Sequence, residues 1–124
     1  MTNSEMKAAA QSNLDLIMEQ IEIYSVAKRV SDTSWVVIAN ENPGETACLT
    51  RQEGGHNFQG GPVQAVRFDN RQNAEVAAES AAKLFDSEHI RPVVVGLGTA
   101  FRRKLAALVE MRHVMEKTIA AIGE

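Results

Sequence analysis

The chain has 124 residues, of which 44% are hydrophobic, and it carries a formal net charge of −3, which argues against a strongly basic nucleic-acid binder. This length suits one domain over residues 1–124, and no apolar run approaches the roughly 18 residues that a membrane-spanning helix needs. The single cysteine, Cys48, excludes an internal disulfide and is typical of a reducing compartment. Because no basic start followed by an apolar stretch opens the chain, we expect no signal peptide and a cytoplasmic protein.

The first segment predicts a helix. Thr2 and Glu5 have the spacing of a capping box. The apolar residues that follow recur at intervals of four and three, and so share one face: Met6, Ala10, Leu14, Ile17 and Ile21. Residues 23–30 then hold Ile, Tyr and Val without a helical period, which indicates a strand.

Three further strands are predicted at residues 35–39, 46–52 and 62–68. A glycine-rich loop over residues 53–61 separates the last two of them. The connections between these runs are short, which favours an antiparallel meander.

Two helices complete the expected fold. Asp69 and Gln72 have capping-box spacing before an alanine-rich helix. Residues 93–95 are either a short strand or the buried lead-in to a long last helix, which we expect Thr99 to cap and Gly123 to end. The fold class is therefore α+β: an N-terminal helix, a small antiparallel meander of three to four strands, an alanine-rich helix and a long C-terminal helix.

The strongest local feature is the glycine turn at residues 96–99, which leads into the last helix. Free backbone N–H groups and the helix dipole favour an anion at such a turn. Three cations, Arg102, Arg103 and Lys104, follow where a helix normally favours acids, and a bound phosphate or carboxylate resolves that conflict. The alternative is an ordinary helix start with solvated cations. The motif is neither a dinucleotide fingerprint nor a P-loop.

Two weaker features point to ligands. In the loop over residues 53–61, Phe58 is placed to stack on a base, unless the loop is simply a mobile hairpin end. Basic and aromatic residues on predicted strands, among them Trp35 and Arg51, resemble the stacking platforms of single-strand binders. The alternative is that Trp35 and Tyr24 belong to the core.

No spacing in the sequence indicates catalysis or metal binding, so we expect no enzyme, no metal and no cofactor. The three histidines are dispersed, and Cys48 reads as a small buried hydrophobe. The last helix has a second apolar stripe of Ala107, Val114 and Ala121, which predicts a homo-oligomer. Residues 91–124 carry a net charge of +3, from six basic and three acidic residues, and assembly would repeat that patch.

The overall plan, with a meander that ends at residues 68–71, resembles small accessory proteins of bacteriophages. Within that group it is most similar to the single-stranded-DNA-binding transcription cofactors of N4-like phages. The resemblance implies single-stranded DNA binding, recruitment of a phage RNA polymerase and a location in the host cytoplasm.

The leading hypothesis is a non-enzymatic, oligomeric protein that binds single-stranded nucleic acid. The phosphate-binding candidates are Arg102, Arg103, Lys104, Arg91, Arg67, Arg29 and Lys28, and the stacking candidates are Phe58 and Trp35. One alternative is a protein-interaction module, such as a phage inhibitor of a host or defence protein. The other is a binder of a small anionic ligand.

Overall fold

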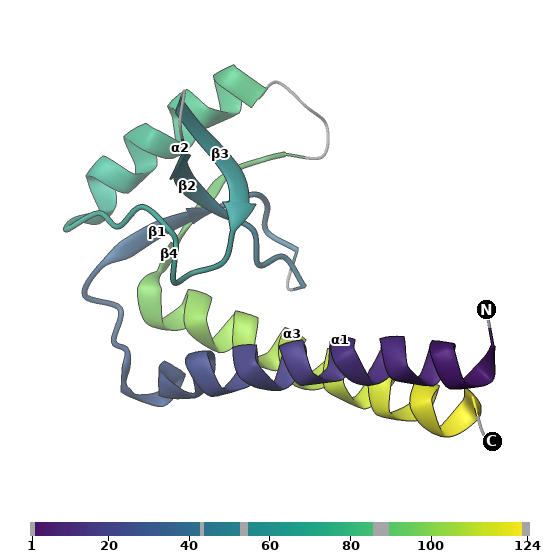
Figure 1. Ribbon diagram of the computed structural model, residues 1–124. Helices are drawn as coiled ribbons and strands as arrows, with labels where there is room; N and C mark the ends of the chain where they lie inside the picture. The colour runs from purple at the N-terminus through teal and green to yellow at the C-terminus, as the bar shows by residue number, and fades with distance from the viewer. Residues whose placement is uncertain (1, 43, 53–54, 86–89, 123–124) are drawn as a thin grey trace.

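The computed structural model describes residues 2–42, 44–52, 55–85 and 90–122. The helices are α1 (Asn3–Tyr24), the short 3-10 helix η1 (Ser25–Arg29), α2 (Arg71–Phe85) and α3 (Leu97–Ile122). The strands are β1 (Trp35–Ile38), β2 (Cys48–Gln52), β3 (Gly55–Gly60) and β4 (Val93–Gly96). The predicted α+β fold, with an N-terminal helix, an alanine-rich helix and a long C-terminal helix, is confirmed (Figure 1).

The four strands form one antiparallel sheet in the order β3-β2-β1-β4. The first three follow one another as the predicted meander. α2 then carries the chain across to the opposite edge, where β4 pairs with β1 from Trp35↔Gly96 to Ile38↔Val93. Residues 93–95 are therefore a strand, which is one of the two alternatives that the sequence left open.

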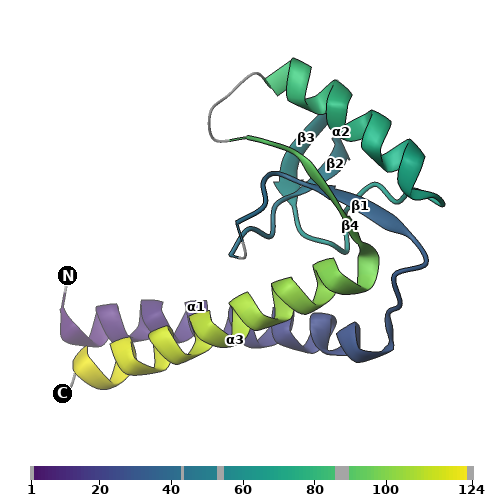
Figure 2. The same ribbon diagram turned by 180° about the vertical axis from the view of Figure 1, so that it is seen from behind.

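Alternation along β1 divides the core between the two faces of the sheet. Val36 and Ile38 belong to a cluster with residues of α1 and α3, whereas Val37 packs with Leu49 of β2 and Ala78 of α2. The result is three layers, with α2 on one face and the helix pair on the other. α1 and α3 run antiparallel side by side and extend beyond the sheet, so that both termini lie at the far end of the pair (Figures 1 and 2).

The capped start of α1 is confirmed, because the Glu5 backbone N–H donates to the Thr2 hydroxyl at 3.1 Å. The strand predicted over residues 23–30 is wrong. α1 continues to Tyr24 and passes into η1, because Tyr24 and Ala27 (1% and 0% exposed) are buried in the core between the helices and the sheet. Tertiary packing overrides the strand preference of the Ile, Tyr and Val side chains here.

The predictions for residues 53–61 and 62–68 are also wrong. Residues 55–60 form β3, which begins with a positive φ at Gly55 (143°), whereas residues 53 and 54 of the predicted loop lie outside the described residues. Residues 62–65 form a turn instead, with Gln64 N–H donating to the Gly61 carbonyl at 3.1 Å. The segment after it joins the sheet at two points: the Val66 N–H donates to the Leu49 carbonyl at 2.9 Å, and an isolated bridge joins Phe68 to Trp35. Pro62, which lacks an N–H group, suits a turn better than a ladder.

The predicted cap of α2 is off by one residue. Asn70, not Asp69, accepts the hydrogen bond from the Asn73 backbone N–H, at 2.8 Å. Ala74 and Ala78 are buried against the sheet as expected, but Leu84 is 72% exposed. The end of α3 at Gly123 lies outside the described residues.

Phe101→Ala should lower the free energy of unfolding by about 3–5 kcal/mol, because the ring is 5% exposed and packs edge-on against Tyr24 at 5.3 Å. Val76→Ala, at a position that is 59% exposed on α2, is the control and should change stability by less than about 0.5 kcal/mol. Urea denaturation followed by circular dichroism measures both. Equal losses would contradict this placement of the core.

Candidate functional site

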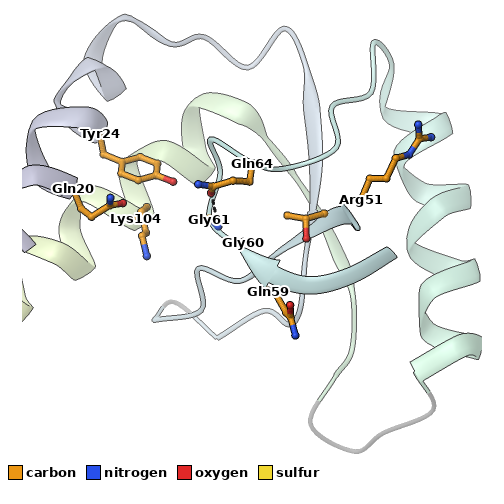
Figure 3. A pocket seen from close by; sticks show the side chains of 9 residues that line it. Gln20, Tyr24, Arg51, Gln59, Gly60, Gly61, Gln64 and Lys104 are labelled. Carbon is orange, nitrogen blue, oxygen red and sulfur yellow. Dashed lines mark hydrogen bonds between the residues drawn. The ribbon is translucent and has the colours of Figure 1, made fainter. Parts of the chain in front are cut away.

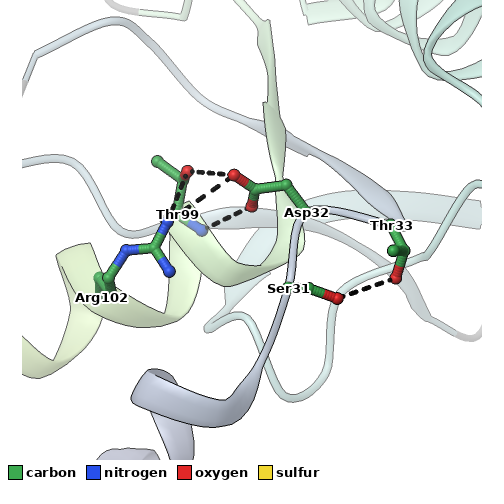
Figure 4. Close-up of polar contacts among 5 residues, drawn as sticks. All are labelled: Ser31, Asp32, Thr33, Thr99 and Arg102. Atoms are coloured by element: carbon green, nitrogen blue, oxygen red, sulfur yellow. Dashed lines mark hydrogen bonds and ion pairs between the residues drawn. The ribbon is translucent and has the colours of Figure 1, made fainter.

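The carboxylate of Asp32 lies at the glycine turn where α3 begins. The Thr99 backbone N–H donates to Asp32 Oδ1 at 2.9 Å, and the Thr99 hydroxyl donates to Oδ2 at 3.0 Å. Arg102 adds an ion pair at 3.7 Å (Figure 4). Thr99 is therefore not the N-cap: α3 begins at Leu97, and Asp32 caps it from a distant part of the chain. The Thr99 hydrogen bond, more than the nearby Arg102 charge, lowers the pKa of Asp32.

The glycines of this turn make room for that contact. A Cβ at Gly96 would overlap the Asp32 side chain, and a Cβ at Gly98 would overlap the Val30 carbonyl oxygen. Neither glycine has a positive φ, so close approach is the reason for glycine here. The sequence pattern was thus a genuine anion site, but the anion is internal.

The three cations that follow the turn do not form one patch. Successive residues of an α-helix point roughly 100° apart, so a run of three faces three directions. Arg102 pairs with Asp32, and Arg103 is partly buried, with no hydrogen-bond partner for its Nη1 among the described residues. Lys104 points elsewhere, toward Gln20 and Tyr24 of α1 (Figure 3).

Lys104 borders a cleft with a volume of about 480 Å³. The cleft lies between the helix pair and the β2–β3 hairpin. Its lining is Gln20, Tyr24, Thr50, Arg51, Gln59, Gly60, Gly61, Gln64 and Lys104. The Arg51 side chain extends away from this group toward α2, so Lys104 is the cation that faces the cleft (Figure 3).

Hydrogen bonds hold the walls of the cleft. The Tyr24 hydroxyl accepts from the Val63 backbone N–H at 3.1 Å, and Gly61 N–H donates to Gln64 Oε1 at 3.0 Å. Burial raises the pKa of Tyr24, so this hydroxyl stays neutral. A Cβ at Gly61 would lie only 2.5 Å from the Tyr24 hydroxyl oxygen, so glycine is required for the wall to close on α1.

The charged residues that line the cleft, among those the structure describes, are basic. Of the residues that the structure describes, no aspartate or glutamate lines it. Lys104 is partly buried, and no hydrogen bond or ion pair joins its ammonium group to another residue of the described ranges. A partly desolvated cation without a partner favours an incoming anion.

The predicted stacking residues lie elsewhere. Phe58 packs edge-on against Phe85 of α2 at 5.2 Å, so it is part of the second core cluster and not the end of a mobile loop. Trp35 is partly covered by Arg71, whose guanidinium lies 5.4 Å from the ring centre. The two rings therefore do not form a common platform with Lys104.

The other predicted cations are exposed and dispersed. Lys28 and Arg29 lie on η1, whereas Arg67 and Arg91 lie in connecting segments. Of all the predicted phosphate contacts, only Lys104 lines the cleft. The cleft residues that sequence reasoning missed are Gln20, Gln59 and Gln64, which come from three separate segments and have no common spacing.

Cys48 takes no part in this site. It is fully buried as expected, and burial raises the pKa of its thiol to about 12. Among the described residues no group of histidine, cysteine and acidic side chains is placed to hold a metal ion. Nor does any helix within the described ranges have the length and apolar character needed to cross a membrane.

Comparison of the chain with protein-family models, with curated proteins and with solved structures finds no match. The chemistry of the cleft is therefore the basis for assigning a function.

Asp32→Ala should destabilise the protein by about 1 kcal/mol at neutral pH, because it removes the cap of α3. Since folding lowers the pKa of Asp32, the stabilisation from its charge is complete above the ordinary value of 3.8. It is lost as the pH falls through the lower value of the folded state. Denaturant titrations of both proteins at several pH values measure this difference.

Asp32→Asn is the matched variant, because it keeps a hydrogen-bond acceptor for Thr99 and loses only the charge. It should be less destabilising than Asp32→Ala at neutral pH and show a weaker dependence on pH. A difference between wild type and Asp32→Asn that persists unchanged at about pH 2 would show that the charge is not the source.

Proposed function

We propose that the protein is a non-enzymatic nucleic-acid-binding protein that prefers single strands and holds one phosphate at Lys104 in the cleft. The observation that carries this proposal is the partly buried Lys104 ammonium group in a polar cleft: within the described part of the chain it has no ion-pair partner, and no acidic residue lines the cleft. Phosphate oxygens are the anions that such a cation binds through charge-assisted hydrogen bonds.

The amide side chains around Lys104 suit the rest of a nucleotide. Gln20, Gln59 and Gln64 each carry a donor and an acceptor, the combination that base edges and sugar hydroxyls also present. At about 480 Å³ the cleft is in the range of pockets that hold small organic groups. Tyr24 is the aromatic residue among the described lining residues, and it is only 1% exposed, so binding relies on phosphate and amide contacts more than on stacking.

A recessed site favours a single strand over a duplex. Duplex DNA is read by elements that project into its grooves, whereas Lys104 lines a concavity. A single strand turns its phosphates and bases independently and so can place both in the cleft. The small number of cations involved predicts modest affinity that falls with added salt.

Fluorescence anisotropy with a labelled thymidine oligonucleotide tests the proposal. Wild type should bind at low salt, and Lys104→Ala should weaken binding about tenfold, the contribution of one charge-assisted hydrogen bond. The slope of log affinity against log salt should fall by about 1, because one phosphate contact is lost. Lys117→Ala, on the same helix but outside the cleft, is the control and should change neither quantity by as much.

Three results would overturn the proposal. One is the absence of binding at micromolar protein and low salt. Another is an equal loss of affinity in the Lys117→Ala control. The third is competition by a mononucleotide at the affinity of the oligonucleotide, which would identify a small-ligand site instead.

We further propose that the protein self-associates through the exposed apolar side chains of its helix pair. Leu16 and Ile23 of α1 (59% and 47% exposed) are seven residues apart, as are Ala107, Val114 and Ala121 of α3. A spacing of seven places side chains on one side of a helix, the arrangement that pairs helices in bundles. A symmetric assembly would also bring two Lys104 clefts onto one strand.

Light scattering should therefore give a mass of a dimer or larger assembly, well above the 13.5 kDa of one chain. Val114→Glu, at a position that is 58% exposed, should reduce that mass to the monomer without unfolding the chain. Lys117→Glu on the same helix is the control for the added acid. A monomer mass for wild type across a wide range of concentration would rule out self-association.

A further inference from the structure

A second cavity of about 310 Å³ lies on the opposite side of the sheet from the cleft, between β2, β3 and α2. Leu49, Phe68 and Ala81 are among the apolar residues that line it, and Leu84 and Phe85 border it at the end of α2. The cavity exists because α2 presents alanines to the sheet, and small side chains leave space where larger ones would fill it.

Leu84 does not close this cavity. It is 72% exposed, the most exposed of the large hydrophobic side chains, although it borders an apolar concavity. An apolar surface of this kind gains free energy when a nonpolar group displaces water from it.

Arg51 is the one arginine or lysine among the described residues that line the cavity. Arg51 borders it, with a side chain that extends from β2 toward α2 (Figure 3), and His56 lies beside it. Among the described residues, the lining contains no aspartate or glutamate. Within the described ranges no carboxylate forms an ion pair with the Arg51 guanidinium. Alternation along β2 turns neighbouring side chains to opposite faces: Cys48 packs with the helix pair, whereas Leu49 packs with Ala78 of α2.

We propose that this cavity binds a small amphipathic anion, an aliphatic chain that ends in a carboxylate. The chain would lie against Leu49, Phe68 and Ala81, and the carboxylate would accept hydrogen bonds from Arg51, whose planar fork suits that group. A group the size of a water molecule occupies about 30 Å³, so the cavity has room for a chain of about ten such groups. The apolar lining therefore fits the aliphatic chain of such a ligand, and the Arg51 charge fits its carboxylate.

Titration calorimetry with decanoate on the full chain tests the proposal. Wild type should give saturable binding to one site. Leu84→Glu, which places a negative charge at the mouth, should weaken binding at least about tenfold. Val76→Glu is the matched control, because it adds the same charge at an equally exposed position of α2 that does not border the cavity.

The carboxylate contact is tested separately with the Arg51→Gln variant and with decanol. Arg51→Gln should weaken decanoate binding about tenfold and leave decanol binding unchanged, because decanol has no charge to lose. Lys104→Ala should leave decanoate binding unchanged, which separates this site from the nucleic-acid proposal.

Three outcomes would overturn the proposal. These are no saturable binding up to about 1 mM decanoate, equal losses in Leu84→Glu and Val76→Glu, and decanol binding as tight as that of decanoate with no effect of Arg51→Gln.

Discussion

The contact between Asp32 and the first turn of α3 sets the geometry on which the rest of the molecule depends. It joins the segment that leaves η1 to the start of the longest helix, through the Thr99 backbone N–H and hydroxyl. A helix that begins at a fixed residue has a fixed rotational phase, because each residue advances it by roughly 100°. That phase directs Phe101 into the core and Lys104 into the cleft, so the cap determines both the stability of the helix pair and the chemistry of the site.

The sheet then separates two different surfaces. On β2, Thr50 faces the helix pair and its polar cleft, whereas the neighbouring Arg51 faces α2 and the apolar cavity. A strand turns consecutive side chains to opposite faces, so one short strand serves both sites with adjacent residues. Arg51 borders both cavities, and its side chain extends toward α2 (Figure 3).

Local signals in the sequence predicted the elements that depend on local interactions. The capped start of α1, the β1 strand and the alanine-rich helix have strong patterns, and all three are present. The predictions for residues 23–30 and 55–60 were wrong, because they depend on tertiary contacts: the burial of Tyr24 in the first segment and the pairing of β3 with β2 in the second. At the glycine turn the sequence left open a bound anionic partner or an ordinary helix start, and the structure places the protein's own Asp32 there. No spacing along the chain indicates this contact, because Asp32 and Thr99 are 67 residues apart. Gln20, Gln59 and Gln64 were not predicted as cleft residues for the same reason, because only the folded chain brings them together.

Whether a cation is available to a ligand depends on its neighbours in space and not on its neighbours in sequence. Arg71, Arg102 and Arg112 each lie within 4 Å of a carboxylate, so much of their charge is neutralised internally. Lys104 and Arg51 form no such pair with any residue in the described ranges, and each borders a cavity. A solvated cation on a convex surface gains little from one more anion, whereas a partly buried cation such as Lys104 has already lost part of its hydration and gains more from a direct hydrogen bond to an anion. On an acidic protein the position of two unpaired cations is therefore a better guide to binding than the net charge.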